Sequence, residues 1–191
     1  MKVIGINGSP RKDGNTGILI RKVFDELEKE GIETELVDLA GKKMHGCIAC
    51  YRCAQNQDKR CAVTGDFMNE CISKMLEADG IILGSPVYFS NVSAEMKALI
   101  DRAGLVAKVN GDMLKRKVGA SVVAVRRAGA LHVFNSMNHF FFISQMVVPG
   151  SSYWNLGIGR DKGEVEGDAE GMQTMKHLGQ NMAWLLKKLK D

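Results

Sequence analysis

Four of the five cysteines fall within one short segment, with the spacing Cys47-x2-Cys50-x2-Cys53-x7-Cys61. Thiols at two-residue spacing can turn together toward one compact metal core. A zinc site usually takes two cysteine pairs from separate knuckles, whereas a cubane iron–sulfur cluster is commonly held by such a triplet and a fourth thiolate. The segment therefore predicts a [4Fe-4S] cluster with these four ligands. Cluster-free thiols and a zinc site are the alternatives.

A second set of polar residues follows the first apolar run of the chain and precedes a helical pattern. It comprises Ser9, Arg11, Asn15 and Thr16. Hydroxyl, amide and backbone N–H donors at a helix N-terminus suit a terminal phosphate monoester. The dinucleotide fingerprint and the nucleotide-hydrolysing P-loop are both absent from this loop. The loop therefore favours a mononucleotide such as FMN, and a plain polar turn that caps the helix is the alternative.

Two later loops suit the flavin ring. The first carries Pro86, Val87, Tyr88 and Phe89, in which aromatic side chains adjoin backbone donors for the polar edge of the isoalloxazine. The second carries Arg127 and Gly129, and a cation there would stabilise the reduced, anionic ring. The alternatives are aromatic side chains that only cap the sheet and arginines that are only solvated.

The elements that must position these loops alternate between strand and helix. Apolar runs predict strands at 3–6, 80–84, 118–125 and 146–148, and alternation predicts one at 33–39. Helical spacing predicts helices at 16–31, 67–76 with Asp66 as its cap, 94–104, 131–145 and 168–189. This alternation predicts an α/β fold with a doubly wound parallel sheet, in which ligands bind beyond the carboxyl ends of the strands. The loops at 7–16, 85–92 and 126–130 should meet at that edge.

Length and composition narrow the class of protein. The 191 residues predict a single domain over 1–191, with the cysteine-rich loop inserted at about 40–65. A net charge of +4 is too small and too dispersed to indicate nucleic-acid binding, and no apolar run is long enough to span a membrane. We expect a cytoplasmic protein, where clustered cysteines are typical of metal or redox sites. Cys71, in an apolar helical pattern, should be a buried small hydrophobe.

The chain resembles the NADPH-dependent FMN reductase family of flavodoxin-like proteins, and within it the iron–sulfur flavoprotein branch. The resemblance rests on the loop Gly5–Arg11 with Asn15-Thr16, on Gly84–Phe89 and on the compact cysteine motif. It implies a flavodoxin-like five-stranded sheet of order 2-1-3-4-5, bound FMN and a homodimer or homotetramer. Such flavin sites often borrow residues from a neighbouring subunit, and Tyr153 and Trp154 are the candidates here.

The expected function is that of a flavin-dependent oxidoreductase that exchanges electrons with a ferredoxin-like partner and a small-molecule acceptor. The cofactors carry this chemistry, so no catalytic side chain is predicted. One alternative is an NAD(P)H-dependent FMN or quinone reductase without a cluster. Others are a flavin electron carrier or redox sensor without turnover, and a zinc-stabilised interaction module.

Overall fold

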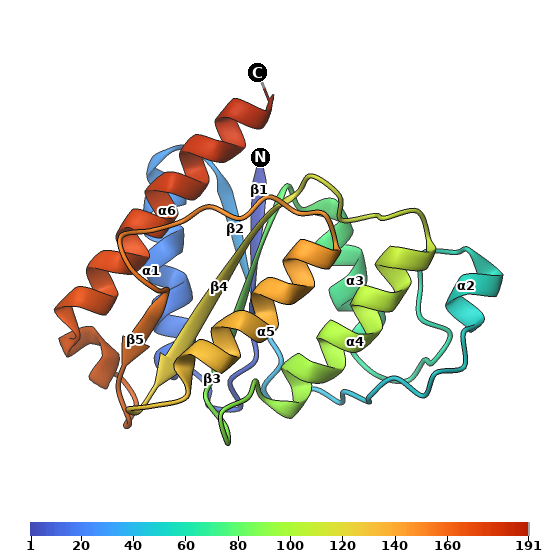
Figure 1. The fold of residues 1–191 in the computed structure, drawn as a ribbon, viewed down its shortest axis with the longest axis horizontal. Coiled ribbons are helices and arrows are strands. Elements are labelled where there is room, and N and C mark those ends of the chain that lie inside the picture. The colour runs from blue at the N-terminus through green and yellow to red at the C-terminus, as the bar shows by residue number, and fades with distance from the viewer. Residues whose placement is uncertain (191) are drawn as a thin grey trace.

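The strands of the sheet follow the apolar runs of the sequence. The computed structural model, which describes residues 1–190, has a five-stranded parallel sheet of order β2-β1-β3-β4-β5 (Figure 1). The strands are β1 (Lys2–Asn7), β2 (Glu33–Asp38), β3 (Gly80–Pro86), β4 (Val118–Val125) and β5 (Leu156–Ile158). β3 and β4 are buried along almost their whole length, as expected of central parallel strands. The predicted fold class and strand order are confirmed.

Five main helices connect and cover the strands. They are α1 (Asn15–Lys29), α3 (Met68–Glu77), α4 (Ala94–Val109), α5 (Ala130–Ile143) and α6 (Ala169–Lys190). α1 ends as the sequence predicts, since Gly31 follows the helix with a φ of +74° that suits glycine. The Ser93 hydroxyl caps α4 by accepting a hydrogen bond from the Met96 N–H. α4 runs past the predicted end at Gly104, because Val106 and Ala107 continue its buried face.

The fifth strand is where the sequence prediction was wrong. Val147 forms only an isolated bridge to Val118, at the start of β4, and the strand proper is Leu156–Ile158, beside the end of β4. The apolar character of 146–148 reflects its contact with the sheet, but the chain leaves the sheet at Pro149 and returns seven residues later. Two further short elements, α2 (Arg52–Asn56) and the 3-10 helix η1 (Glu164–Gly167), lie in segments expected to be irregular.

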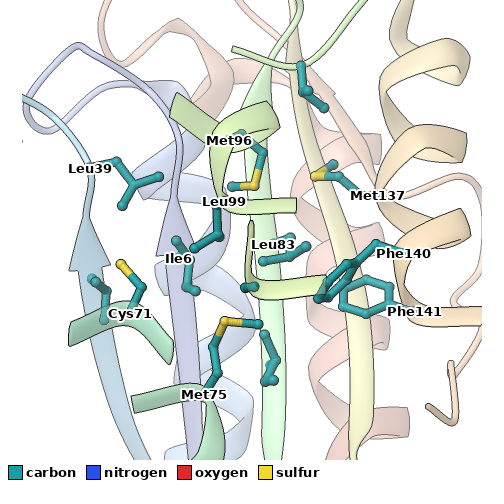
Figure 2. Close-up of a cluster of buried hydrophobic side chains, with 14 of the residues drawn as sticks. Ile6, Leu39, Cys71, Met75, Leu83, Met96, Leu99, Met137, Phe140 and Phe141 are labelled. Atoms are coloured by element: carbon teal, nitrogen blue, oxygen red, sulfur yellow. The ribbon is translucent and has the colours of Figure 1, made fainter. Parts of the chain in front are cut away.

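The core forms on both faces of the sheet. α1 and α6 cover one face, and α3, α4 and α5 cover the other (Figure 1). On the second face, Figure 2 shows Cys71 and Met75 of α3 near Ile6, and Phe140 and Phe141 of α5 near β4. Cys71 is completely buried, as predicted, and burial raises the pKa of its thiol to about 12. This packing leaves the carboxyl ends of the strands free for loops that line a site.

Candidate flavin cavity and cysteine segment

A cavity of about 230 Å³ lies at the carboxyl ends of the strands, the lower edge of the sheet in Figure 1. Three of the predicted loops contribute to it, together with a fourth that follows β5. Its lining comprises Ser9, Arg11, Asn15, Thr16, Pro86, Val87, Tyr88, Ala124, Arg126, Gly159 and Arg160. Seven of the ten predicted flavin-site residues therefore line one cavity. Phe89, Arg127 and Gly129 do not.

The first loop is shaped by a short series of hydrogen bonds. The Asn7 side chain accepts from the Ser9 N–H at 3.1 Å, and the Ser9 hydroxyl accepts from the Arg11 N–H at 3.2 Å. The Arg11 carbonyl then accepts from the Gly14 N–H, which leads into α1. These contacts turn the chain sharply between β1 and α1. They place the start of the helix at the cavity.

The N-terminus of α1 offers polar groups that the chain itself does not satisfy. The first N–H groups of a helix have no intrahelical partner, and Gly14 at the N-cap has no side chain to accept from them. Thr16 is only 1% exposed and lines the cavity, so its hydroxyl can donate to a group bound there. An anion in the cavity would satisfy these donors, so this end of the cavity suits a phosphate.

The fourth loop is held by residues that the sequence suggested for phosphate binding. The Asn15 side chain donates to the Asp161 carbonyl and accepts from the Gly163 N–H, both at 2.9 Å. The Arg11 guanidinium donates to the Arg160 carbonyl at 2.9 Å. Asn15 therefore serves mainly to position this loop. The sequence missed Gly159 and Arg160 because the strand before them was assigned to the wrong segment.

The loop after β3 differs from the expectation in its backbone. The Val87 N–H donates to the Ala124 carbonyl, and Tyr88 and Asn91 exchange a pair of backbone hydrogen bonds. Two N–H groups expected to serve the ring are therefore engaged within the chain. Between Tyr88 and Asn91, Phe89 and Ser90 both have positive φ, 47° and 59°, which is strained for non-glycine residues. The Phe89 side chain at this tip is fully exposed.

The loop after β4 presents a different arginine from the one predicted. Arg126 lines the cavity, whereas Arg127 is exposed outside it. Gly129 is the N-cap of α5, with a φ of +86°. A Cβ there would lie 2.8 Å from the Ser90 hydroxyl oxygen and 3.1 Å from Val87 Cγ1. Gly129 thus lets the loops after β3 and β4 pack closely, although it does not itself line the cavity.

The four clustered cysteines lie along a different part of the molecule. Cys47 and Cys50 are exposed, whereas Cys53 and Cys61 are buried. All four line one small hollow, and its other lining residues are Ile48, Tyr51, Ala62, Val63, Arg102, Leu105 and Val106. Within residues 1–190, no three His, Cys, Asp or Glu side chains converge as the ligands of a single metal ion do. The thiolates of a cubane each bind a different iron, so they need not converge in this way.

The cysteine segment is ordered by polar contacts with α3 and α4. The Asn69 side chain accepts from the Cys61 N–H at 2.8 Å and donates to the Cys61 carbonyl at 2.9 Å. The Asn110 side chain donates to the Cys53 carbonyl at 3.2 Å and accepts from the Lys59 N–H. These amides fix the backbone at both buried cysteines. The sequence suggested that a bound cluster would account for the order of this loop, but these contacts already do so.

A buried arginine from α4 completes the hollow. Arg102 Nε and Nη2 each lie 3.3 Å from Cys61 Sγ, and the guanidinium forms an ion pair with Asp66, whose side chain is also buried. Burial alone would raise the pKa of Asp66, but hydrogen bonds from Arg102 and the His45 N–H hold that pKa below its usual range. Burial and the neighbouring Cys61 raise the pKa of the Cys53 thiol.

The sequence did not single out Arg102, although a charged residue within the apolar pattern of α4 is a signal of a buried polar contact. Asp66, expected to cap α3, lies 3.4 Å from the Met68 N–H but chiefly binds this arginine. Four thiols, an apolar wall and a buried cation suit a negatively charged metal–sulfur centre. The donor set therefore fits an iron–sulfur cluster.

The remaining predicted residues lie outside both sites. Tyr153 and Trp154 are exposed, and their rings contact each other with centroids 6.0 Å apart, while Trp154 also lies against Phe134. Neither ring lines the cavity. The cavity and the cysteine hollow share no lining residue. Within residues 1–190, no helix is long and apolar enough to cross a membrane.

Comparisons with known proteins show the family to which the chain is similar. The model of the NADPH-dependent FMN reductase family matches residues 1–161. An iron-sulfur flavoprotein of Methanocaldococcus jannaschii is 41% identical over the full length of both chains, and one of Methanosarcina thermophila is 35% identical over 98% of this chain and 96% of its own. An NADPH azoreductase of Bacillus sp. is 27% identical over 72% of this chain and 67% of its own.

Solved structures agree with the fold. RosB, solved with bound 8-demethyl-8-formylriboflavin-5'-phosphate, superposes with a TM-score of 0.79 at 23% identity and covers 100% of this chain and 80% of its own. A flavodoxin from the domain Archaea superposes with a TM-score of 0.63 at 16% identity, over 98% of this chain and 99% of its own. At these identities the likeness establishes the flavodoxin-like fold alone.

Proposed function

The chain belongs to the NADPH-dependent FMN reductase family, and from that membership we propose that it is an FMN-dependent oxidoreductase with an iron–sulfur cluster. The observation that carries the proposal is the presence of two separate sites in one chain, a phosphate-suited cavity and a hollow lined by four cysteines. Full-length relatives named iron-sulfur flavoprotein support the same pair of cofactors. When bound, FMN supplies two-electron and one-electron transfer, and the cluster supplies one-electron transfer.

The cavity residues have distinct roles in this proposal. Ser9, Thr16 and the first N–H groups of α1 bind the phosphate, and Arg11 offsets its charge. Pro86, Val87 and Tyr88 provide the surface for the ring. Arg126 lines the cavity, whereas Arg127 does not, and Arg126 stabilises negative charge on a reduced ring. No side chain has to transfer a proton, because the chemistry belongs to the cofactor.

The cysteine residues provide the second site. Cys47, Cys50, Cys53 and Cys61 hold a [4Fe-4S] cluster in this proposal, with Ile48, Leu105 and Val106 shielding it from water on one side. Cys47 and Cys50 are exposed, so this site lies at the surface, where a redox partner can approach. The segment 40–65 supports a one-electron partner that is acidic, such as a ferredoxin. Its exposed charged side chains are Lys42, Lys43, Arg52, Asp58, Lys59 and Arg60.

A homodimer or homotetramer is also part of the proposal. An apolar groove of about 750 Å³ lies between α4 and α5, and Phe142 and Ile143 on its rim are exposed. Exposed apolar surface of this kind is typical of subunit contacts. Since the two sites of one chain share no lining residue, a neighbouring subunit would offer a route between them. Analytical ultracentrifugation of the purified protein measures this directly.

The test of the two-cofactor proposal is anaerobic purification followed by spectroscopy and by analysis of flavin, iron, zinc and acid-labile sulfide. We expect flavin absorption bands with a broad shoulder, and about four iron and four sulfide per chain. Flavin without iron would contradict the cluster assignment. Cys50→Ala should abolish the cluster and leave FMN binding intact, and equal loss of both cofactors would contradict separate sites.

A second candidate function is an NAD(P)H-dependent FMN, quinone or azo-compound reductase without a cluster. It is favoured by the family match and by the similarity to an NADPH azoreductase. Rapid oxidation of NADPH by protein that lacks iron would support it. Slow turnover with NADPH, together with rapid reduction by ferredoxin, would support the two-cofactor enzyme. Flavin binding without any turnover would indicate an electron carrier or redox sensor.

A further inference from the structure

A buried, positively charged side chain lies beside one of the clustered sulfurs. Arg102 is 1% exposed, and two of its nitrogens, Nε and Nη2, each lie 3.3 Å from Cys61 Sγ. A buried charge is costly unless it is paired and hydrogen-bonded. The Asp66 carboxylate supplies the pair. Burying the guanidinium costs free energy, and two of its N–H groups donate to a cysteine sulfur. We infer that this arginine does more than pack against its neighbours.

The same guanidinium joins both ends of the cysteine segment to α4. Nη1 donates to the His45 carbonyl at 3.0 Å, and Nη2 donates to the Val63 carbonyl at 2.8 Å. Asp66 reinforces the first contact by accepting from the His45 N–H at 3.0 Å. The planar fork of arginine presents five N–H donors in fixed directions, and lysine cannot reproduce this geometry. Arg102 thereby sets where Cys61 lies relative to the rest of the segment.

We propose that Arg102 is the positioning residue for Cys61, holding that thiolate as the fourth ligand and raising the reduction potential of the bound cluster. The inference rests on the proposed iron–sulfur function. Hydrogen bonds to ligand sulfurs and the charge around a cluster are established determinants of its potential. The two N–H donors favour the more negative, reduced state. Asp66 offsets the net charge of the guanidinium, so the hydrogen bonds themselves are the main contribution.

Two variants test this proposal. Arg102→Lys keeps a cation beside Asp66 but loses the fork, and the double variant Arg102→Leu with Asp66→Asn removes both buried charges together. Iron and sulfide are measured after anaerobic reconstitution, and the midpoint potentials of cluster and flavin are measured by spectroelectrochemical titration. We expect the equilibrium constant for cluster reduction to fall by about tenfold, because the two lost hydrogen bonds are stronger in the reduced state than in the oxidised state. The flavin potential should not change.

Glu26→Gln is the matched control, because Glu26 is also buried and paired, with Lys29, but lies on α1 on the opposite face of the sheet. It should leave both potentials unchanged. A folded variant of Arg102 that takes up less iron than wild type would support the proposal. Wild-type iron content and an unchanged cluster potential in a folded variant would overturn it.

Two further outcomes separate this inference from the proposed function. Wild-type protein that takes up no iron and sulfide would overturn both the cluster assignment and the role of Arg102. Failure of both Arg102 variants to fold, while Glu26→Gln folds, would give the arginine a purely structural role and overturn the inference alone. Circular dichroism of wild type and of each variant shows whether the protein folds, and it is recorded before any titration.

Discussion

The cavity at the carboxyl ends of the strands, here called the flavin cavity, and the hollow lined by the four cysteines are formed in opposite ways. The cavity lies where parallel strands end, and its residues belong to the ends of β3 and β4, to the loops after β1, β3, β4 and β5 and to the start of α1. The hollow lies in a segment without strands, and its order comes from individual side chains on α3, on α4 and at the C-cap of α4, namely Asn69, Arg102 and Asn110. One site follows from topology, and the other depends on individual polar contacts.

The difference has a physical consequence for stability and function. A site at strand ends is supported by the whole sheet, so single substitutions there should alter binding more than folding. A loop held by a few buried hydrogen bonds depends on each of them, because an unpaired buried polar group is costly. The cysteine segment should therefore be the more fragile of the two sites.

The largest expected effect comes from breaking the buried ion pair. Asp66→Ala leaves the Arg102 guanidinium without its partner, and removal of one member of such a pair typically costs about 3–5 kcal/mol. We expect a fall of that size in the free energy of unfolding, measured with urea at pH 7. Hydrogen exchange should increase first in the segment from 45 to 63, while the affinity for FMN remains near that of wild type.

Asp101→Ala is the matched control for this prediction. Asp101 lies on α4 next to Arg102, but its ion pair with Lys97 is exposed. Exposed pairs contribute about 0–1 kcal/mol, so a small change is expected. Equal losses of stability in Asp66→Ala and Asp101→Ala would show that the cysteine segment does not depend on the buried pair.

The next effect tests the flavin cavity. Ser9→Ala combined with Arg11→Ala removes a hydroxyl and a cation from the phosphate end. A hydrogen bond from the hydroxyl to the charged phosphate is worth about 1.5–3 kcal/mol, and Arg11 adds little because it is exposed and its charge is screened. We expect affinity for FMN to fall by about 10- to 100-fold, measured by fluorescence titration of the apoprotein. Riboflavin, which lacks the phosphate, should bind nearly as before.

Lys12→Ala is the control, because Lys12 lies in the same loop and is exposed but does not line the cavity. It should leave both affinities close to wild type. Unchanged FMN affinity in the double variant would refute the assignment of this loop to the phosphate. An equal loss for FMN and riboflavin would place the two residues near the ring instead.

The same contrast governs what the sequence can predict. Strands β1, β3 and β4 have strong apolar runs, and the loops after them converge because parallel strands end at one edge. This reasoning correctly predicted cavity residues such as Ser9, Thr16, Pro86 and Tyr88. β5 has only three residues with glycine in the middle, so the apolar, β-branched run at 146–148 looked more like a strand. The loop at 159–163 was missed with it.

The contacts of the cysteine segment were beyond prediction for a different reason. Spacing alone identified the four thiols, and the structure brings them to one hollow. Nothing in a single sequence links Cys61 to Arg102, which is 41 positions later, or Asp66 to the same guanidinium. Such pairs are decided by tertiary packing.

The smallest expected effect concerns the contact between the loop after β3 and the loop after β4. Gly129→Ala forces a side chain into a φ of +86° and brings its Cβ within 2.8 Å of the Ser90 hydroxyl oxygen. Gly111→Ala meets a similar φ of +89°, but no atom lies within 4 Å of its Cβ. Both should lose about 1 kcal/mol of stability from the left-handed backbone. Only Gly129→Ala should also displace Val87 and weaken FMN binding, by about threefold to tenfold. Equal FMN affinities in the two variants would mean that the packing of these loops does not shape the cavity.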